Sequence, residues 1–345
     1  MIPAPSGVLP PLPRHGGALA WAEAQFGVPP HGWVDLSTGV NPWPYPLPPL
    51  PPAIAHRLPD DDLLHQACSL AARHAGAVGS SGVVAGAGSQ ALIASLPRLR
   101  PPAQVAVIGH AYAEHALSWR RAGHRVREIP SPEAVTEHDM VVVLINPNNP
   151  DGHSLLPADL FPLADRLAER GGWLVVDEAF ADTRPEISLA PFTGRHPALW
   201  VLRSFGKFFG LAGLRLGFAL TTPLLANTLR EALGPWAVSG PALWAAGLAL
   251  ADQPWIVATR IRLREAAAVL DQDLQAAGLT VRGGTPLFRL ASSPHAAALF
   301  VRAAQAGVLV RIFTEEARSH WLRFGLPADD DARARLQAVL AAAPA

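Results

Sequence analysis

The chain has 345 residues, of which 50% are hydrophobic and 16% charged, enough apolar sequence for a large folded domain with a smaller one attached. Its 28 basic and 28 acidic side chains balance, so net charge favours neither nucleic acid nor an acidic membrane surface as a partner. The single cysteine, Cys68, excludes an internal disulfide and a metal site of several cysteines, which favours a reducing, cytoplasmic location.

The first sixty residues are rich in proline and glycine, with one helical pattern over residues 19–26. The start, MIPAPSGVLP, has neither the basic segment nor the apolar run of a signal peptide. No apolar run in the chain approaches the roughly 20 residues that span a bilayer, so we expect no membrane segment. The proline-rich stretch 42–52 lacks the backbone donors of a central strand or helix and predicts an ordered arm that ends near Asp60.

Short apolar runs then alternate with helical patterns as far as residue 203. Such runs, separated by helices, predict an α/β large domain whose mainly parallel sheet is sandwiched between helices. The expected strands are 82–85, 104–109, 126–129, 140–145, 173–177 and 198–203, and the expected helices are 61–75, 89–96, 113–122 and 158–170.

From Thr221 to about Ala276 the pattern is helical, with breaks at Gly234-Pro235 and Gly240-Pro241. A smaller α+β domain follows, with strands expected at 286–291, 308–312 and 321–324 and helices at 294–306 and 329–343. We therefore expect three regions, namely an arm that is partly in the small domain (1–50), the large domain (51–254) and the rest of the small domain (255–345).

One segment, VLRSFGKFFGLAGLRLGF at 201–218, places Lys207 among three phenylalanines. Apolar neighbours disfavour the ammonium form and favour the free amine that attacks carbonyl groups. Ser204 and Arg215 add a hydroxyl and a planar set of N–H donors suited to a phosphate. An amine with a phosphate site suggests pyridoxal phosphate held as a Schiff base, while the alternative is a basic turn that packs aromatic side chains into the core.

Two further segments follow expected strands and favour a ligand site at the carboxyl edge of the sheet. The glycines of AGAGSQ (85–90) allow close backbone approach, and the helix that follows offers free N–H groups to an anion. The alternatives are a tight turn or a weak dinucleotide motif, although the acidic residue that the dinucleotide motif requires is missing. INPNNPDG (145–152) predicts a rigid loop with outward amides, and a simple turn is the alternative.

Asp177 ends the apolar strand in VVDEAF (175–180). A carboxylate at such a position is costly unless a cation or hydrogen-bond donors accompany it. A protonated pyridine nitrogen would be a suitable partner. A metal-binding or helix-capping aspartate is the alternative interpretation.

The glycine loop, NPNNP, DEAF and S-x-x-K-x7-R, in this order, resemble the fold-type I pyridoxal-phosphate enzymes of the aspartate aminotransferase superfamily over residues 15–325. The resemblance implies that Lys207 carries the cofactor and that Asp177 keeps its ring nitrogen protonated. It also implies that Asn149 binds the ring hydroxyl and the substrate, and that Tyr112 stacks on the ring as a third catalytic group. The residues implied to hold the cofactor phosphate are Gly88, Ser89, Gln90, Ser204 and Arg215.

Within this superfamily, RHGG (14–17), DLSTGVNP (35–42) and GPWAVS (234–239) resemble the threonine-phosphate decarboxylases of cobalamin biosynthesis. Histidinol-phosphate aminotransferases are the next most similar group. The resemblance implies decarboxylation of L-threonine O-3-phosphate, with an aminotransferase as the alternative, and a homodimer with no metal. Arg323 would bind the substrate carboxylate, and His15 and Gly16 its phosphate. From its sequence position alone, His15 is an ordinary loop histidine.

Three positions depart from the family pattern. Asp151 replaces a loop threonine, Leu58 replaces a tyrosine that reaches the neighbouring subunit, and Phe180 stands where aminotransferases often carry a tyrosine. The last change removes the tyrosine hydroxyl that would contact the ring hydroxyl of the cofactor. Two readings from other classes stay open: a nicotinamide oxidoreductase built on the glycine loop, and a non-catalytic protein that has kept the fold.

Overall fold

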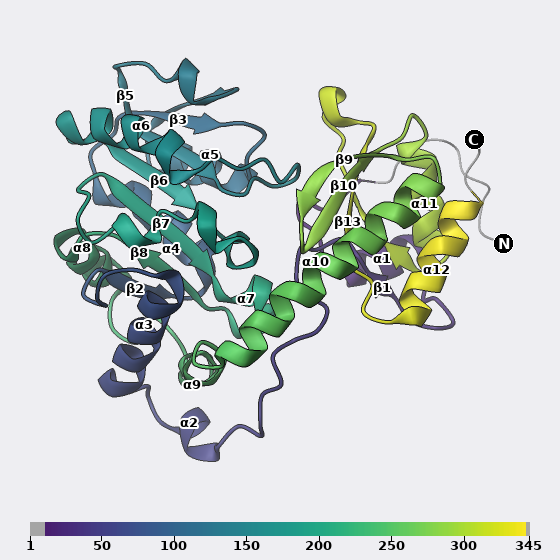
Figure 1. The fold of residues 1–345 in the computed structure, drawn as a ribbon, viewed down its shortest axis with the longest axis horizontal. Coiled ribbons are helices and arrows are strands. Elements are labelled where there is room, and N and C mark those ends of the chain that lie inside the picture. The colour runs from purple at the N-terminus through teal and green to yellow at the C-terminus, as the bar shows by residue number, and fades with distance from the viewer. Residues whose placement is uncertain (1–10, 343–345) are drawn as a thin grey trace. The chain divides into compact units, whose positions relative to one another are not determined.

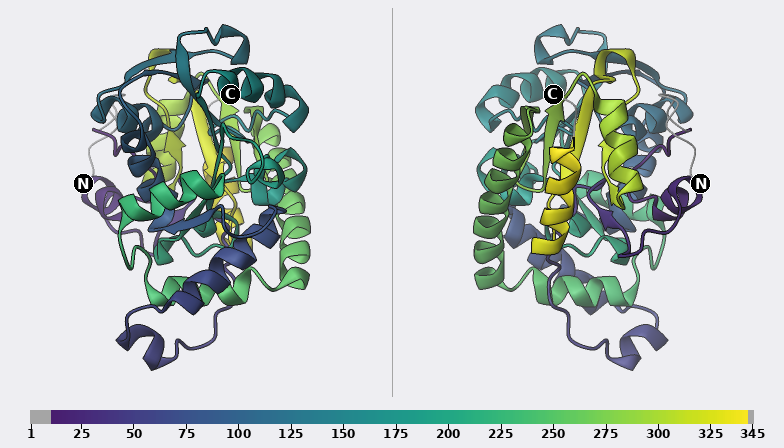
Figure 2. Two further views of the ribbon diagram at one scale, coloured as in Figure 1. Left: turned by 90° about the vertical axis from the view of Figure 1, so that its left-hand side faces the viewer. Right: turned by 90° about the vertical axis from the view of Figure 1, so that its right-hand side faces the viewer.

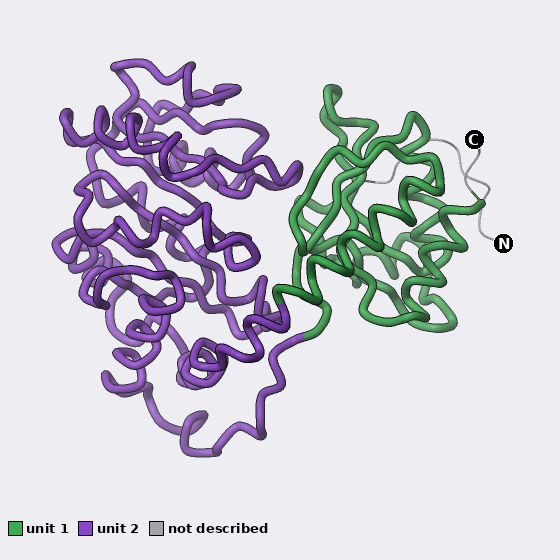
Figure 3. Tube along the Cα trace, in the orientation of Figure 1, with its two compact units in different colours: residues 1–43, 260–345 green, residues 44–259 purple. Residues whose placement is uncertain are grey.

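The computed structural model describes residues 11–342. The chain forms two compact units: residues up to 43 pack with residues from 260 onward, and residues 44–259 form the larger unit (Figure 3). The division falls inside α10 (Gln253–Ala276), close to the expected start of the small domain at 255. The expectation about a signal peptide falls on residues 1–10, outside the described part, as does the end of the helix expected over 329–343.

The larger unit contains a seven-stranded sheet of order β2-β8-β7-β6-β5-β3-β4 (Figure 1). Only β8 runs against its neighbours, so the predicted α/β architecture with a mainly parallel sheet is confirmed. β8 itself was not predicted, because GFAL is short and follows the lysine segment directly. The strands are β2 (Val83–Gly86), β3 (Gln104–Ile108), β4 (Arg125–Ile129), β5 (Asp139–Ile145), β6 (Trp173–Asp177), β7 (Leu199–Ser204) and β8 (Gly217–Leu220).

Helices cover this sheet as the apolar pattern predicts. One core cluster joins the sheet to α4, α5 and α8 and includes the fully buried side chains of Leu92, Trp119 and Trp200. Outside that cluster, α3 lies against β2 and β8, and α9 packs on α3. The helices of this unit are α2 (Pro52–His56), α3 (Asp61–Ala75), α4 (Gly88–Ser95), α5 (Ala113–Arg121), α6 (Pro157–Glu169), α7 (Phe205–Phe208), α8 (Pro223–Leu233) and α9 (Gly240–Ala249).

Local signals explain several helix ends. The Asp60 carboxylate accepts a hydrogen bond from the Leu63 N–H at 2.8 Å and caps α3, which ends at Gly76 in the left-handed region. The predicted break at Gly240-Pro241 is the first turn of α9, where proline costs no hydrogen bond. The proline-rich arm ends earlier than expected, because α2 begins at Pro52.

The smaller unit has a four-stranded antiparallel sheet of order β12-β13-β10-β9 and a parallel pair of β1 with β11. The right-hand view of Figure 2 shows α10, α11 and α12 side by side along this unit. β1 and β9 were not predicted, since one is two residues long and the other, TVRGGT, is polar and glycine-rich. The elements are α1 (Leu19–Phe26), β1 (Val34–Asp35), β9 (Thr280–Thr285), β10 (Phe288–Ser292), α11 (Ala296–Gln305), β11 (Val308–Leu309), β12 (Arg311–Ile312), β13 (Trp321–Gly325) and α12 (Asp330–Ala341).

No helix among residues 11–342 combines the length and the apolar character needed to cross a membrane.

Candidate functional site

The four segments singled out in the sequence meet at one edge of the larger unit's sheet. β5, β6 and β7 are parallel neighbours, and β2 runs in the same direction beyond β8. The loop that holds Asn149 follows β5, Asp177 ends β6, Ser204 ends β7, and α4 follows β2 by one residue. Carboxyl ends of parallel strands share an edge, so the topology places these groups in one region.

Asp177 is buried with 4% of its surface exposed, and its carboxylate has two partners. His115 Nε2 lies 2.8 Å from Oδ2, and the Ala179 N–H donates to Oδ1 at 3.0 Å. The carboxylate is therefore oriented and ready to face a cation. His115 was missed in the sequence, although its place one turn after Tyr112 in α5 is a usable signal. The described residues include no cluster of three or more metal-ligand side chains, so no observation supports the metal-binding interpretation of Asp177.

The start of α4 forms a cradle lined by glycine backbone. Gly88 has φ +78°, and a Cβ there would lie 2.7 Å from Arg215 Nη2. A Cβ at Gly217 would lie 2.4 Å from the Ser89 backbone nitrogen. Both positions therefore require glycine, which brings the guanidinium and the N–H groups of Gly88, Ser89 and Gln90 together. This arrangement of cation and helix N-terminus suits a phosphate group.

Tyr112 contacts Gln90 of the cradle and His115, the partner of Asp177. Its hydroxyl donates to Gln90 Oε1 at 3.3 Å, and its ring meets the His115 ring edge to face at 6.4 Å between centroids. Burial raises the pKa of Tyr112, and the carboxylates of Glu114 and Asp177 raise it further. The phenol therefore keeps its proton and presents an aromatic face.

Lys207 lies in the single turn α7 and is half-buried. The Phe180 ring lies beside its amine, with its centroid 5.9 Å from Nζ. The neighbouring phenylalanines instead pack on one another and on Trp255: the Phe205 and Phe209 rings stack at 4.8 Å, and Phe209 stacks on Trp255 at 5.6 Å. These ring contacts fix the turn α7 within the larger unit.

A buried network of charges lies under the lysine turn. Arg203, next to Ser204, pairs with Glu178 at 2.9 Å and with Asp182, and Asp182 also meets His74 at 2.8 Å. Burial alone would raise the pKa of Asp182, but Arg203 and His74 together lower it, whereas burial raises the pKa of Glu178 despite Arg203. The network ties the DEAF segment to β7, and thereby Asp177 and Phe180 to Lys207.

The Asn-Pro loop after β5 is held by its own side chains. Asn146 is buried, and its amide accepts from the Leu155 N–H at 2.9 Å and donates to the Leu155 carbonyl at 2.9 Å. Asp151 accepts from Asn148 Nδ2 at 2.9 Å and from the His153 N–H at 3.0 Å. Asp151, one of the departures from the family pattern, therefore holds the loop internally and leaves the half-buried Asn149 in a rigid frame.

In the smaller unit, Arg323 is buried and Nη2 donates to the Ser37 carbonyl at 2.7 Å. Burial and, to a smaller extent, the charge of Arg311 lower the pKa of Arg323 to about 10, while Asp35 opposes this shift. Arg311 stands opposite Arg323 in the antiparallel pair of β12 and β13. The two guanidinium groups on neighbouring strands repel each other, and a bound anion would relieve this repulsion. Arg311 was missed in the sequence, where an arginine in an apolar strand was the available signal.

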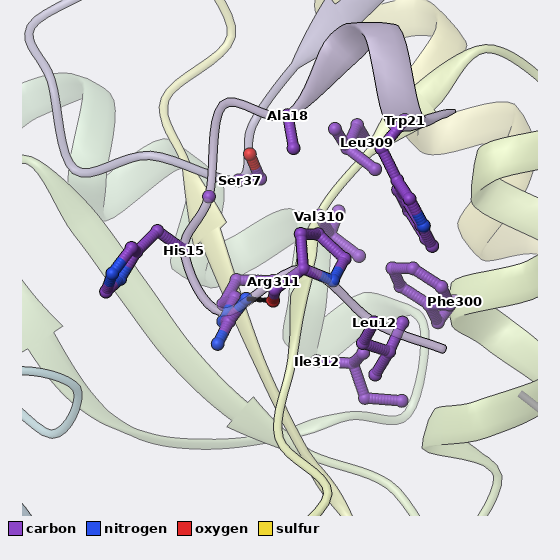
Figure 4. A pocket seen from close by; sticks show the side chains of 12 residues that line it. Leu12, His15, Ala18, Trp21, Ser37, Phe300, Leu309, Val310, Arg311 and Ile312 are labelled. Atoms are coloured by element: carbon purple, nitrogen blue, oxygen red, sulfur yellow. Dashed lines mark hydrogen bonds between the residues drawn. The ribbon is translucent and has the colours of Figure 1, made fainter. Parts of the chain in front are cut away.

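His15 and Gly16 lie in a segment that borders a small pocket of the same unit (Figure 4). Arg311 donates to the carbonyls of Pro13 and Arg14 at 2.8 Å each and so holds this segment. Figure 4 shows the His15 imidazole on the side away from the apolar side chains of the pocket. A Cβ at Gly16 would lie 2.3 Å from the Ser37 carbonyl oxygen, so the backbone can approach there only with glycine.

The groups of the larger unit fit pyridoxal phosphate. The glycine-lined cradle with Arg215 matches an anionic phosphate, and the buried carboxylate of Asp177 matches a protonated ring nitrogen. Lys207 supplies the amine that the cofactor aldehyde requires.

Comparison with known proteins agrees with this chemistry. The family "Aminotransferase class I and II" matches residues 54–339. The chain is 46% identical to a threonine-phosphate decarboxylase from Pseudomonas aeruginosa, over 95% of this chain and 97% of that protein. It is 42% identical to one from Sinorhizobium sp., over the same shares of both chains, and 30% identical to a histidinol-phosphate aminotransferase from Geobacter sp. (strain M21), over 89% and 91%.

Two solved structures share the fold. The histidinol-phosphate aminotransferase from Sinorhizobium meliloti, in complex with pyridoxal-5'-phosphate, aligns with a TM-score of 0.79 at 24% identity over 93% of this chain and 92% of that one. L-threonine-O-3-phosphate decarboxylase from Porphyromonas gingivalis aligns with a TM-score of 0.71 at 20% identity over 84% and 93%. At identities below 25%, these alignments show a shared fold but do not show a shared activity.

Proposed function

Because the chain belongs to the class I and II aminotransferase family, we propose that it is a pyridoxal-phosphate-dependent decarboxylase of L-threonine O-3-phosphate. The products are carbon dioxide and (R)-1-amino-2-propanol O-2-phosphate, used in cobalamin biosynthesis. The observation that carries the cofactor assignment is the buried Asp177–His115 pair at the same sheet edge as Lys207. The choice of reaction is supported by 46% and 42% identity to threonine-phosphate decarboxylases, against 30% to the aminotransferase.

In this proposal the cofactor is bound by the larger unit. Its phosphate is held by the N–H groups of Gly88, Ser89 and Gln90, the Ser204 hydroxyl and Arg215. Asp177, oriented by His115, holds the proton on the ring nitrogen, Asn149 binds the ring hydroxyl, and Tyr112 covers one ring face. Lys207 attaches the cofactor through Nζ.

When bound, the cofactor supplies a sink for the electron pair of the bond that breaks at Cα. Arg323 binds the substrate carboxylate and orients the Cα–carboxylate bond for cleavage, since only a correctly oriented bond reacts. Carbon dioxide leaves, the electron pair stays with Cα, and Lys207 Nζ delivers a proton to that carbon. Asp177 favours the protonated ring nitrogen throughout.

The substrate phosphate is bound by the segment of His15 and Gly16, with Arg311 as a further cation. A phosphorylated amino acid carries two anionic groups, and the Arg311–Arg323 pair together with His15 binds both. Asn149 contacts the substrate as well as the ring. The absence of a hydroxyl at Phe180, beside Lys207 Nζ, distinguishes this chain from the aminotransferases that carry a tyrosine there.

An aminotransferase of the histidinol-phosphate type is the second candidate, favoured by 30% identity to the enzyme from Geobacter sp. (strain M21). In that reaction Lys207 would remove the Cα proton, and no carbon dioxide would leave. The two activities give different products. Carbon dioxide release without a keto acid indicates decarboxylation, whereas amino transfer that requires a keto acid indicates the alternative.

The decisive experiment incubates the purified protein, loaded with pyridoxal phosphate, with L-threonine O-3-phosphate. Carbon dioxide is measured together with the amine phosphate, and histidinol phosphate with 2-oxoglutarate serves as the competing assay. Lys207→Ala is the inactive control. Transfer to 2-oxoglutarate with no carbon dioxide would overturn the proposal, and a protein that shows no cofactor absorbance would favour the nicotinamide or non-catalytic reading.

The proposal includes a cytoplasmic homodimer, carried over from the family. It is supported by exposed apolar side chains of the larger unit, among them Trp236 (62% exposed) and Leu58 (66%). Mass measurement during size-exclusion chromatography tests this, and a monomeric mass at micromolar concentration would contradict it.

A further inference from the structure

Ser37 connects two groups that the proposed function assigns to different ends of the substrate. Its hydroxyl accepts a hydrogen bond from the Gly17 N–H at 2.7 Å, directly after the segment of His15 and Gly16. Its carbonyl accepts from Arg323 Nη2 at 2.7 Å. The side chain is 2% exposed, so water does not replace either contact readily.

Asp35 orients this residue. Its Oδ1 accepts from the Ser37 hydroxyl at 2.6 Å and from the Ser37 N–H at 2.9 Å, a turn in which the carboxylate holds the backbone two residues on. The Ser37 hydroxyl therefore donates a hydrogen bond to Asp35 and accepts one from the Gly17 N–H. Because one carboxylate oxygen fixes both the hydroxyl and the N–H, the direction of the carbonyl that meets Arg323 is fixed as well.

The surrounding backbone leaves little freedom in this turn. Leu36 is hydrogen-bonded on both sides, from its N–H to the Leu309 carbonyl at 2.8 Å and from its carbonyl to the Gly325 N–H at 2.7 Å. Gly16 lies against the Ser37 carbonyl at a distance that admits no Cβ. The turn is thus a rigid piece between the strand that carries Arg323 and the segment that carries His15.

We propose that the Asp35–Ser37 turn is a positioning element that sets the spacing between the carboxylate-binding Arg323 and the phosphate-binding segment of His15 and Gly16. It thereby selects substrates by the distance between their carboxylate and phosphate groups. This inference rests on the proposed function for the identity of the two anionic groups. Neither Asp35 nor Ser37 touches the reacting atoms.

The test compares L-threonine O-3-phosphate with L-homoserine O-phosphate, which has one more carbon between the same two groups. Ser37→Ala removes the tie to Gly17, while Leu36 keeps its backbone hydrogen bonds and Arg311 still holds the segment at Pro13. Asp35→Ala frees the hydroxyl by a second route. We expect each variant to raise KM for threonine phosphate about fivefold to tenfold with kcat within about twofold, and to lower the preference over homoserine phosphate by a similar factor.

Ser292→Ala is the matched control. Ser292 is also a buried serine of the smaller unit, 7% exposed, and its hydroxyl accepts from Arg282 Nε at 2.9 Å. An unchanged preference in Ser37→Ala and Asp35→Ala, or an equal loss in Ser292→Ala, would overturn the inference. Dissociation constants of the two phosphates, measured by calorimetry on the cofactor-loaded protein, give the same ratio without turnover. A wild-type protein that binds but releases no carbon dioxide would therefore count against the proposed reaction and not against the turn.

Discussion

Replacing Arg203 by methionine tests whether the buried charge network holds the site together. The change keeps the length of the aliphatic chain and leaves Glu178 and Asp182 without their shared cation. Removing one partner of a buried ion pair costs about 3–5 kcal/mol, because the remaining charge cannot be solvated. For a unit of this size the melting temperature should fall by about 6–20 °C.

The loss should depend on pH in a defined direction. Without Arg203, burial raises the folded pKa of Glu178 further above its unfolded value near 4, and Asp182 keeps only His74 as a cationic partner. A raised carboxyl pKa destabilises the fold fully above the folded pKa, and the penalty disappears as the pH falls below the unfolded value. The difference from wild type should therefore be largest at pH 8 and shrink toward pH 5.

Melting curves by circular dichroism at pH 5, 6.5 and 8 measure this effect. Arg120→Met is the control, since the Arg120–Glu128 pair has side chains 46% and 58% exposed and should contribute less than about 1 kcal/mol. If Arg203→Met melts within 3 °C of wild type at pH 8, or if its deficit grows toward pH 5, the stabilising role assigned to the network is wrong.

Three further substitutions address the cofactor site. Gly217→Ala should weaken pyridoxal phosphate binding at least about tenfold in an absorbance titration, because its Cβ would meet the α4 backbone, whereas Gly213→Ala, with no atom within 4 Å, should bind as wild type. Equal affinities would contradict the cradle. Phe180→Tyr adds a donor beside Lys207 and should lower, by about one unit, the pH at which the visible band of the lysine-bound cofactor changes; an upward shift would refute this. Asp177→Asn should reduce kcat at least about a hundredfold with the cofactor still attached, and near-normal turnover would remove Asp177 from the mechanism.

Local sequence patterns were sufficient for much of the fold. The alternation of apolar runs with helical periods predicted six strands of the large sheet, because buried parallel strands require continuous apolar sequence whatever their neighbours are. Lys207, Asp177, Ser204 and Asn149 could be selected for a similar reason. Each is a polar residue at the end of such a run or within four residues of it, and chain direction alone places strand ends at one edge.

Tertiary structure decided the partners of these residues. That His115 orients Asp177, and that Arg203 neutralises Glu178 and Asp182, depends on which helix and strand lie beside which, a relation between positions 21 to 62 residues apart. The same holds for Ser37, which meets Arg323 across 286 residues. The period of a helix or strand reports only which face is buried, so no local pattern specifies a contact of that range. The choice of Lys207 therefore came from the sequence, while the groups that position its neighbours came from the fold.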